Sequence, residues 1–144
     1  MNIANWRHNR TLRNNADPSL FVDSQAGTYE QLARKAWGVA KVLTSRYCLQ
    51  PGDRVGLYIN SPSDYAVCGL AALWARATIV HVSEKRHPRE LGQILQDARA
   101  TLVIADVEVA VLGAGKDVCV PVPLATLMPV ADNLSDVTGC HLSA

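Results

Sequence analysis

The sequence predicts an α/β fold: an open, mainly parallel sheet with helices on both faces, preceded by a short β-hairpin. Short β-branched segments alternate with helical segments between residues 54 and 106, which is the order of parallel strands joined by right-handed crossovers. Two of the helical segments open on a proline, at Pro62 and Pro88. One of them carries no charge along residues 65–75, which is typical of a helix covered on most sides.

The segment SLFVDSQAGTYEQ, residues 19–31, predicts the hairpin and the start of the first helix. Residues 20–22 form the first strand, SQAG supplies the turn, and the second strand enters at Thr28. Thr28 is also the expected N-cap of the helix, with Gln31 as the other half of a capping box. The amphipathic helix that follows ends before the turn QPGD at residues 50–53.

Residues 55–59 predict the first strand of the main sheet. The corner that follows predicts a helix start, with Ser61 as N-cap, Pro62 at the first helical position and Asp64 near the positive end of the helix dipole. The uncharged helix 65–75 comes next. The remaining expected elements are a strand at 78–82, an amphipathic helix from Pro88, strands in TLVIAD (101–106) and DVCVPV (117–122), and one helical turn in LATLMP (124–129). The segment VEVAVLG, 107–113, fits either a short helix or a strand.

Length and charge restrict the partners. The 144 residues, 49% of them hydrophobic, suit one α/β domain spanning 1–144. Fourteen basic and thirteen acidic residues leave a formal charge of +1, so we expect neither a nucleic acid nor a membrane as partner. The four cysteines form no paired spacing and the N-terminus shows no targeting pattern, which favours reduced thiols and a cytoplasmic protein.

The chain contains three weak candidates for a site. LGAGKD at 112–117 lacks the first glycine and the final Ser or Thr of a phosphate-binding loop, so a turn is favoured there. His81 and His87, near Glu84 and Glu90, do not have the spacing of a metal pair, and ordinary surface or core histidines are favoured. EKRHPRE gathers Lys85, Arg86 and Arg89 at a helix start, which fits a solvated loop or, alternatively, an anion site. The residues themselves predict no catalytic residue and no metal ligand.

Three segments, TYEQLARKAWGVAKVL, LQPGDRVGLYINSPSDYAVCGLAALWARATIVHV and HPRELGQILQDARATLVIAD, resemble the N-terminal part of the adenylate-forming superfamily, which includes acyl-CoA synthetases, luciferases and the adenylation domains of peptide synthetases. The resemblance covers residues 20–106 and extends more loosely to 128. It implies an acyl-CoA synthetase-like N-terminal subdomain at 19–128. The segment 129–144 shows no periodicity and is expected to be an irregular tail. PRELGQILQDARA is most similar to the acyl-CoA synthetase branch.

The resemblance implies an acid–thiol ligase that uses ATP, magnesium and CoA through an acyl-adenylate. The family's phosphate loop, adenine- and ribose-binding motifs and C-terminal lysine lie beyond the matched region, so we expect this chain to bind no cofactor alone and to be catalytically incomplete. In some CoA-using relatives a basic residue in the 83–87 loop meets the nucleotide phosphate of CoA, and Lys85 matches that position with Arg86 beside it. The family often has glycine where Arg76 stands, and prolines where His81 and Glu84 stand.

The first interpretation is therefore an N-terminal fragment or truncated relative of an acyl-CoA synthetase. The alternative is a stand-alone, non-enzymatic binding module that reuses this subdomain. A third interpretation is an unrelated flavodoxin-like ligand binder. Because the subdomain packs against a larger remainder in the resembling enzymes, helix 65–75 and the segment CVPVPLATLMPV (119–130) are expected to expose apolar surface, which predicts a homodimer unless the missing remainder covers it.

Overall fold

The computed structural model describes residues 18–22, 25–83, 85–106 and 119–127. The chain begins with an antiparallel hairpin of β1 (Pro18–Val22) and β2 (Gln25–Thr28). The hairpin was expected, but its turn is shorter than the sequence suggested. Val22 pairs with Gln25, so the last three residues of SQAG lie in the strand, and Thr28 ends β2 instead of beginning it. Two-residue connections are the commonest in hairpins because their twist matches that of the strands.

Helix α2 (Tyr29–Ser45) begins where the capping box places it. The Thr28 hydroxyl accepts a hydrogen bond from the Gln31 N–H at 3.2 Å, and the Gln31 side chain accepts one from the Thr28 N–H at 3.0 Å. Two backbone donors that the first turn leaves without helical partners are thereby satisfied. This expected feature is confirmed.

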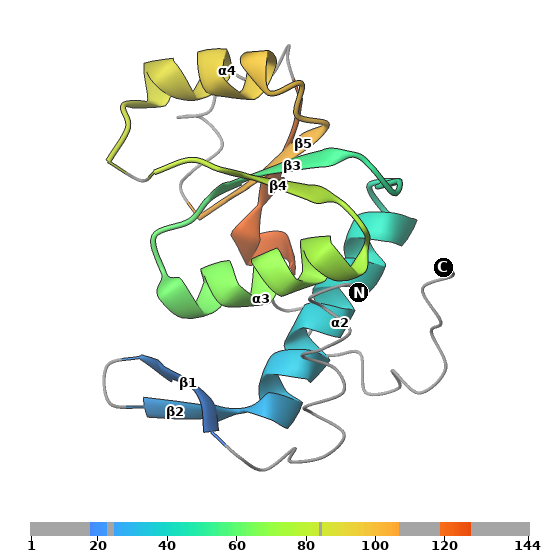
Figure 1. Cartoon of the computed structure of the whole chain (residues 1–144), viewed down its shortest axis with the longest axis vertical. Coiled ribbons are helices and arrows are strands. Elements are labelled where there is room, and N and C mark those ends of the chain that lie inside the picture. Colours follow the sequence, from blue (N-terminus) through green and yellow to red (C-terminus); the bar gives the residue numbers. More distant parts are fainter. Residues whose placement is uncertain (1–17, 23–24, 84, 107–118, 128–144) are drawn as a thin grey trace.

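The main sheet has four parallel strands in the order β4-β3-β5-β6. They are β3 (Arg54–Tyr58), β4 (Thr78–His81), β5 (Leu102–Ala105) and β6 (Val120–Pro123). Helix α3 (Pro62–Trp74) connects β3 to β4, and α4 (Pro88–Asp97) connects β4 to β5. In Figure 1, α4 covers one face of the sheet, whereas α3 and α2 lie on the other. The open parallel sheet with helices on both faces is confirmed.

The strands alternate between two hydrophobic cores because successive side chains point to opposite faces. Val55 and Leu57 of β3 lie in the core beneath α2 and α3, and Tyr58 lies in the core beneath α4. Leu102 and Val103 of β5 divide in the same way. Both faces of these strands are buried, which explains why the sequence shows continuous apolar runs there. Residues 124–127 form the expected helical turn after β6.

Helix α3 is covered by the rest of the chain, as its lack of charge predicted. Its buried residues are Val67, Cys68, Gly69, Leu70, Ala71, Ala72 and Trp74. The Trp74 ring meets that of Trp37 on α2 edge-on, with 5.2 Å between centroids. Among the residues whose side-chain burial the structure describes, Val120 is the only large hydrophobic residue that is mostly exposed. Helix α3 therefore buries most of its apolar residues within this chain, and the expected homodimer stays a prediction.

Helices α3 and α4 end in the same hydrogen-bonded motif, each with an arginine in the left-handed conformation. After α3, Ala77 N–H donates to the Ala72 carbonyl and Arg76 N–H to the Leu73 carbonyl, with Arg76 at φ 59°. After α4, Arg99 has φ 53°. Glycine is the usual residue at this position because it has no Cβ to clash with the following carbonyl.

Candidate functional site

The carboxyl ends of the parallel strands form the edge at which ligands usually bind in open α/β sheets. The chain passes from β3 to β4 on one side and then crosses to β5 on the other, so the strand order reverses between β3 and β5. At such a point the two connections diverge and leave a crevice. The residues that follow β3 and β5 are therefore the first place to look for a site.

At this edge the protein's own carboxylate occupies a backbone donor. Oδ2 of Asp106, directly after β5, accepts a hydrogen bond from the backbone N–H of Asn60, after β3, at 2.6 Å. At the start of α3 the Ser61 hydroxyl accepts the N–H of Asp64 at 3.5 Å. An anionic ligand would compete for these same N–H groups. Sequence reasoning missed the role of Asp106, although an aspartate directly after a buried strand was the available signal.

The loop between β4 and α4, residues 83–87, carries the basic candidates. It is held by its backbone: the Tyr58 hydroxyl donates to the Arg86 carbonyl at 3.1 Å, and the Lys85 N–H donates to the Ser83 hydroxyl at 3.3 Å. The Arg86 N–H also donates to the Ser83 carbonyl at 3.0 Å. These contacts hold Ser83, Lys85 and Arg86 close together. Tyr58 is a positioning residue that the sequence did not single out.

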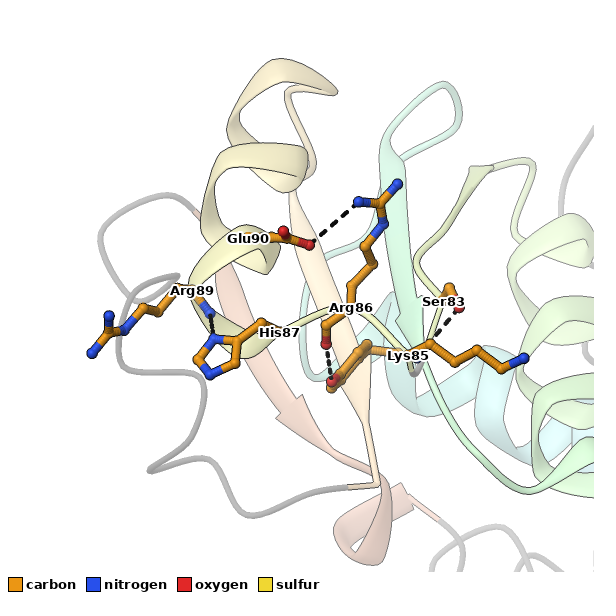
Figure 2. A network of polar contacts seen from close by, with 7 residues as sticks. Ser83, Lys85, Arg86, His87, Arg89 and Glu90 are labelled. Atoms are coloured by element: carbon orange, nitrogen blue, oxygen red, sulfur yellow. Dashed lines mark hydrogen bonds and ion pairs between the residues drawn. The ribbon is translucent and has the colours of Figure 1, made fainter.

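Lys85 and Arg86 are neighbours whose charged groups do not converge. The Arg86 guanidinium turns toward α4 and forms an exposed ion pair with Glu90 at 3.4 Å. The Lys85 side chain leaves in another direction, as Figure 2 shows. Both side chains are exposed. Lys85 thus presents its ammonium to solvent, whereas Arg86 is already partly neutralised.

His87 is the N-cap of α4. Its Nδ1 accepts the backbone N–H of Arg89 at 3.2 Å, an arrangement visible in Figure 2. The ring therefore carries its proton on Nε2 and occupies a donor that an anion at the helix start would use. The Arg89 side chain is exposed. The choice between a solvated loop and an anion site at EKRHPRE stays a prediction.

His81 lies apart from His87, at the end of β4. Its Nδ1 is 2.9 Å from the Tyr65 hydroxyl, and the two rings meet edge-on with 5.4 Å between centroids. Burial raises the pKa of the Tyr65 phenol above its ordinary value. Within the described ranges, no three histidine, cysteine or acidic side chains are grouped as metal ligands. LGAGKD lies outside the described residues.

The cysteines in the described part of the chain are Cys48, Cys68 and Cys119, and all three are free thiols. Cys68 is buried in α3, and burial, with a smaller contribution from the Asp64 charge, raises its pKa from 9.0 to about 12. Burial also raises the pKa of Cys119. Because the thiolate is the nucleophilic form, neither buried thiol is suited to covalent catalysis near neutral pH.

The model of the AMP-binding enzyme family matches residues 8–141, a longer span than the three resembling segments. A long-chain-fatty-acid–CoA ligase of Haemophilus influenzae is 28% identical over 96 residues, which are 66% of this chain and 17% of the relative. An L-proline–[L-prolyl-carrier protein] ligase of Streptomyces coelicolor is 29% identical over 119 residues, 83% of this chain and 22% of the relative. The chain thus spans about a fifth of the curated relatives that it matches.

A solved structure shows the same fold. The N-terminal subdomain of NpsA from Klebsiella oxytoca, in complex with 3-hydroxyanthranilyl-AMSN, superimposes with a TM-score of 0.82 at 22% identity. The match covers 99% of this chain and 35% of that one. Within the described residues, no helix is both long enough and apolar enough to cross a membrane.

Proposed function

The chain belongs to the AMP-binding enzyme family, and we propose that it is the N-terminal portion of an ATP-dependent acyl-CoA synthetase, catalytically incomplete by itself. In the proposed full reaction a carboxylate oxygen attacks the α-phosphorus of ATP and pyrophosphate leaves. A thiol then attacks the acyl carbon, and AMP leaves. The phosphate charge that develops needs donors, cations or a metal held in place.

The observation that carries this proposal is the coverage of the structural match. Nearly the whole chain superimposes on about a third of a solved N-terminal subdomain. The geometry at the sheet edge supports the same view, because the Asn60 N–H after β3 is bound to Asp106. In this proposal the chain supplies scaffold, and the groups that contact ATP come from the remaining length that relatives carry. The fatty-acid–CoA relative supports a CoA acceptor.

An ATP–pyrophosphate exchange assay tests the proposed incompleteness. The purified chain, with magnesium, ATP and a panel of fatty, aryl and amino acids, is expected to give no acid-dependent exchange. A full-length ligase in the same assay is the positive control. Reproducible acid-dependent exchange by this chain alone would overturn the proposal. Reading the coding sequence past residue 144 separates the fragment from the alternative: a Ser/Thr/Gly-rich loop with a lysine supports a fragment, and a stop codon supports a stand-alone module.

A CoA contact is proposed at the 83–87 loop, with Lys85 as its principal residue. Its ammonium is exposed and has no carboxylate partner among the described residues, whereas Arg86 is paired with Glu90. Titration calorimetry with CoA is expected to show weaker binding for Lys85→Ala, by no more than about fivefold because the site is open to solvent.

A matched control separates this contact from general loss of charge. Arg34 on α2 forms an ion pair with Glu30 whose exposure matches that of Arg86–Glu90. Arg34→Ala is expected to leave CoA binding unchanged, and Arg86→Ala to change it less than Lys85→Ala. CoA binding that is unaffected by the double variant Lys85→Ala, Arg86→Ala would remove the contact.

The cytoplasm is the proposed location. The free thiols of Cys48, Cys68 and Cys119 support a reducing compartment, since buried and exposed cysteines alike are unpaired. Rapid alkylation in lysed cells, followed by mass spectrometry, is expected to find Cys48 alkylated and not in a disulfide. A disulfide at Cys48 in freshly quenched cells would contradict this location.

A further inference from the structure

Among the described residues, the outer edge of β4 has hydrogen-bonding groups without a partner strand. The Thr78 N–H donates to the Asp53 carbonyl at 2.8 Å, and the Val82 N–H donates to the Leu57 carbonyl at 3.1 Å, so these residues face β3. Because backbone groups alternate sides along a strand, Ile79 and His81 point their N–H and C=O groups away from the sheet. In the part of the chain that the structure describes, β4 pairs with β3 alone.

The opposite edge of the sheet, at β6, is closed to such pairing. The Val120 N–H donates to the Thr101 carbonyl at 3.1 Å, so Val120 faces β5. By the same alternation Pro121 and Pro123 face outward, and proline has no N–H to donate. Prolines and charges are the usual protection of an edge strand. Strand β4 has neither, since its sequence is TIVH.

We propose that the β4 edge binds a second copy of this chain, with β4 antiparallel to its symmetry mate about a two-fold axis at Val80. In this register Ile79 lies opposite His81 of the second copy. Opposed residues of this kind exchange both of their N–H···O bonds. The two equivalent pairs satisfy every outward group of β4, so a strand of only four residues is complementary to itself. A different partner would have to supply a strand of its own.

The side chains along the edge are compatible with this approach. The His81 ring is held against Tyr65 on α3. The backbone N–H of His81 points away from β3 and has no strand partner among the described residues. Ile79 and Val80 are half-buried and therefore have apolar surface left to cover. The contact through the strands alone is far below the roughly 1,000 Å² that stable interfaces bury, so the dimer is expected to dissociate readily on dilution.

The test measures mass and amide exchange over a range of concentrations. Multi-angle light scattering of the full chain is expected to show the mass rising toward that of two copies. Hydrogen–deuterium exchange at Ile79 and His81 is expected to slow by about tenfold or more between the lowest and highest concentrations, because these amides become bonded. A mass of one copy at all concentrations, with both amides exchanging rapidly, overturns the proposal and leaves the edge to a strand from elsewhere in a longer protein.

Two variants at one residue supply the control. His81→Pro removes the outward N–H without touching the β3 ladder and is expected to weaken the dimer about tenfold or more, since each copy loses one hydrogen bond. His81→Ala loses the same contact with Tyr65 but keeps the N–H, and is expected to dimerise as the parent does. Circular dichroism checks that both are folded. A folded His81→Pro protein that dimerises like His81→Ala also overturns the proposal. If His81→Pro does not fold, the hydrogen–deuterium exchange of the parent protein decides the question.

Discussion

Replacing Arg76 by glycine is expected to stabilise the protein. Arg76 follows Ala75, the C-cap of α3, and has φ 59°; its backbone N–H and C=O are bonded to Leu73 and Gly52. The glycine variant keeps both bonds because they involve only the main chain. The Arg76 guanidinium of the parent protein forms no hydrogen bond or ion pair with any residue in the described ranges, so the substitution removes no such contact.

The magnitude follows from two opposing effects. An L-residue in the left-handed region carries a steric cost of about 1–2 kcal/mol, which glycine avoids. Glycine loses more backbone entropy on folding, about 0.5–1 kcal/mol. The net expectation is an increase of about 1 kcal/mol in the free energy of unfolding, which corresponds to a rise of about 0.5 M in the urea midpoint.

Equilibrium unfolding in urea, followed by tryptophan fluorescence, measures this change, since the Trp37 and Trp74 rings meet edge-on between α2 and α3. The matched control is Lys35→Gly on the exposed side of α2, which removes the same charge from a right-handed helical position. This control is expected to lower stability by about 1 kcal/mol. An Arg76→Gly midpoint equal to or below that of the parent would refute the reasoning.

Three further perturbations test the packing and the buried thiol. Trp74→Asp is expected to leave the chain unfolded by circular dichroism, because an unpaired buried charge costs several kcal/mol against a total stability of about 5–15 kcal/mol, whereas Trp74→Phe is expected to fold. In Gly56→Ala the added Cβ would lie 2.5 Å from Cδ2 of the buried Leu95, so thermal unfolding is expected to show a loss of about 1–3 kcal/mol in the free energy of unfolding. In Gly69→Ala, a substitution within α3, the added Cβ meets only ordinary contacts at 3.7 Å or more. This variant is expected to be neutral or stabilising. The pKa of Cys68 is raised from 9.0 to about 12, so between these pH values the folded state keeps a proton that the unfolded chain loses. The free energy of unfolding is therefore expected to fall, by up to about 4 kcal/mol, as the pH rises from about 9 to about 12. Cys68→Ala is expected to flatten this slope in urea titrations, and an unchanged slope would contradict the assignment.

The sequence by itself determined the local elements of this protein. Thr28 with Gln31, and Ser61 before Pro62, placed two helix starts correctly because a cap satisfies donors within three residues of itself. The absence of charge in 65–75 predicted a buried helix, since charged side chains are rarely desolvated without a partner. The hairpin turn was placed less well, because register depends on both strands and not on the turn residues alone.

The family resemblance also came from sequence, whereas the state of the candidate site did not. Whether Lys85 and Arg86 converge depends on Glu90, one helical turn further on, and on Tyr58, which holds the loop from another strand. No spacing rule within EKRHPRE contains these contacts. Only the folded chain could show that the two charges point apart.

Strand order is the remaining property that only the tertiary structure decided. Residues 55–59, 78–82 and 101–106 read equally well as neighbours in any order, because each is a short, mainly apolar segment and none of them specifies its neighbours. Folding placed β3 between β4 and β5, and this order brings Asp106 to Asn60 and leaves Ile79 and His81 facing outward. The physical reason is that hydrophobic patterning specifies which side chains are buried, whereas the pairing of backbone groups between distant segments is settled only when the helices pack and the strands meet.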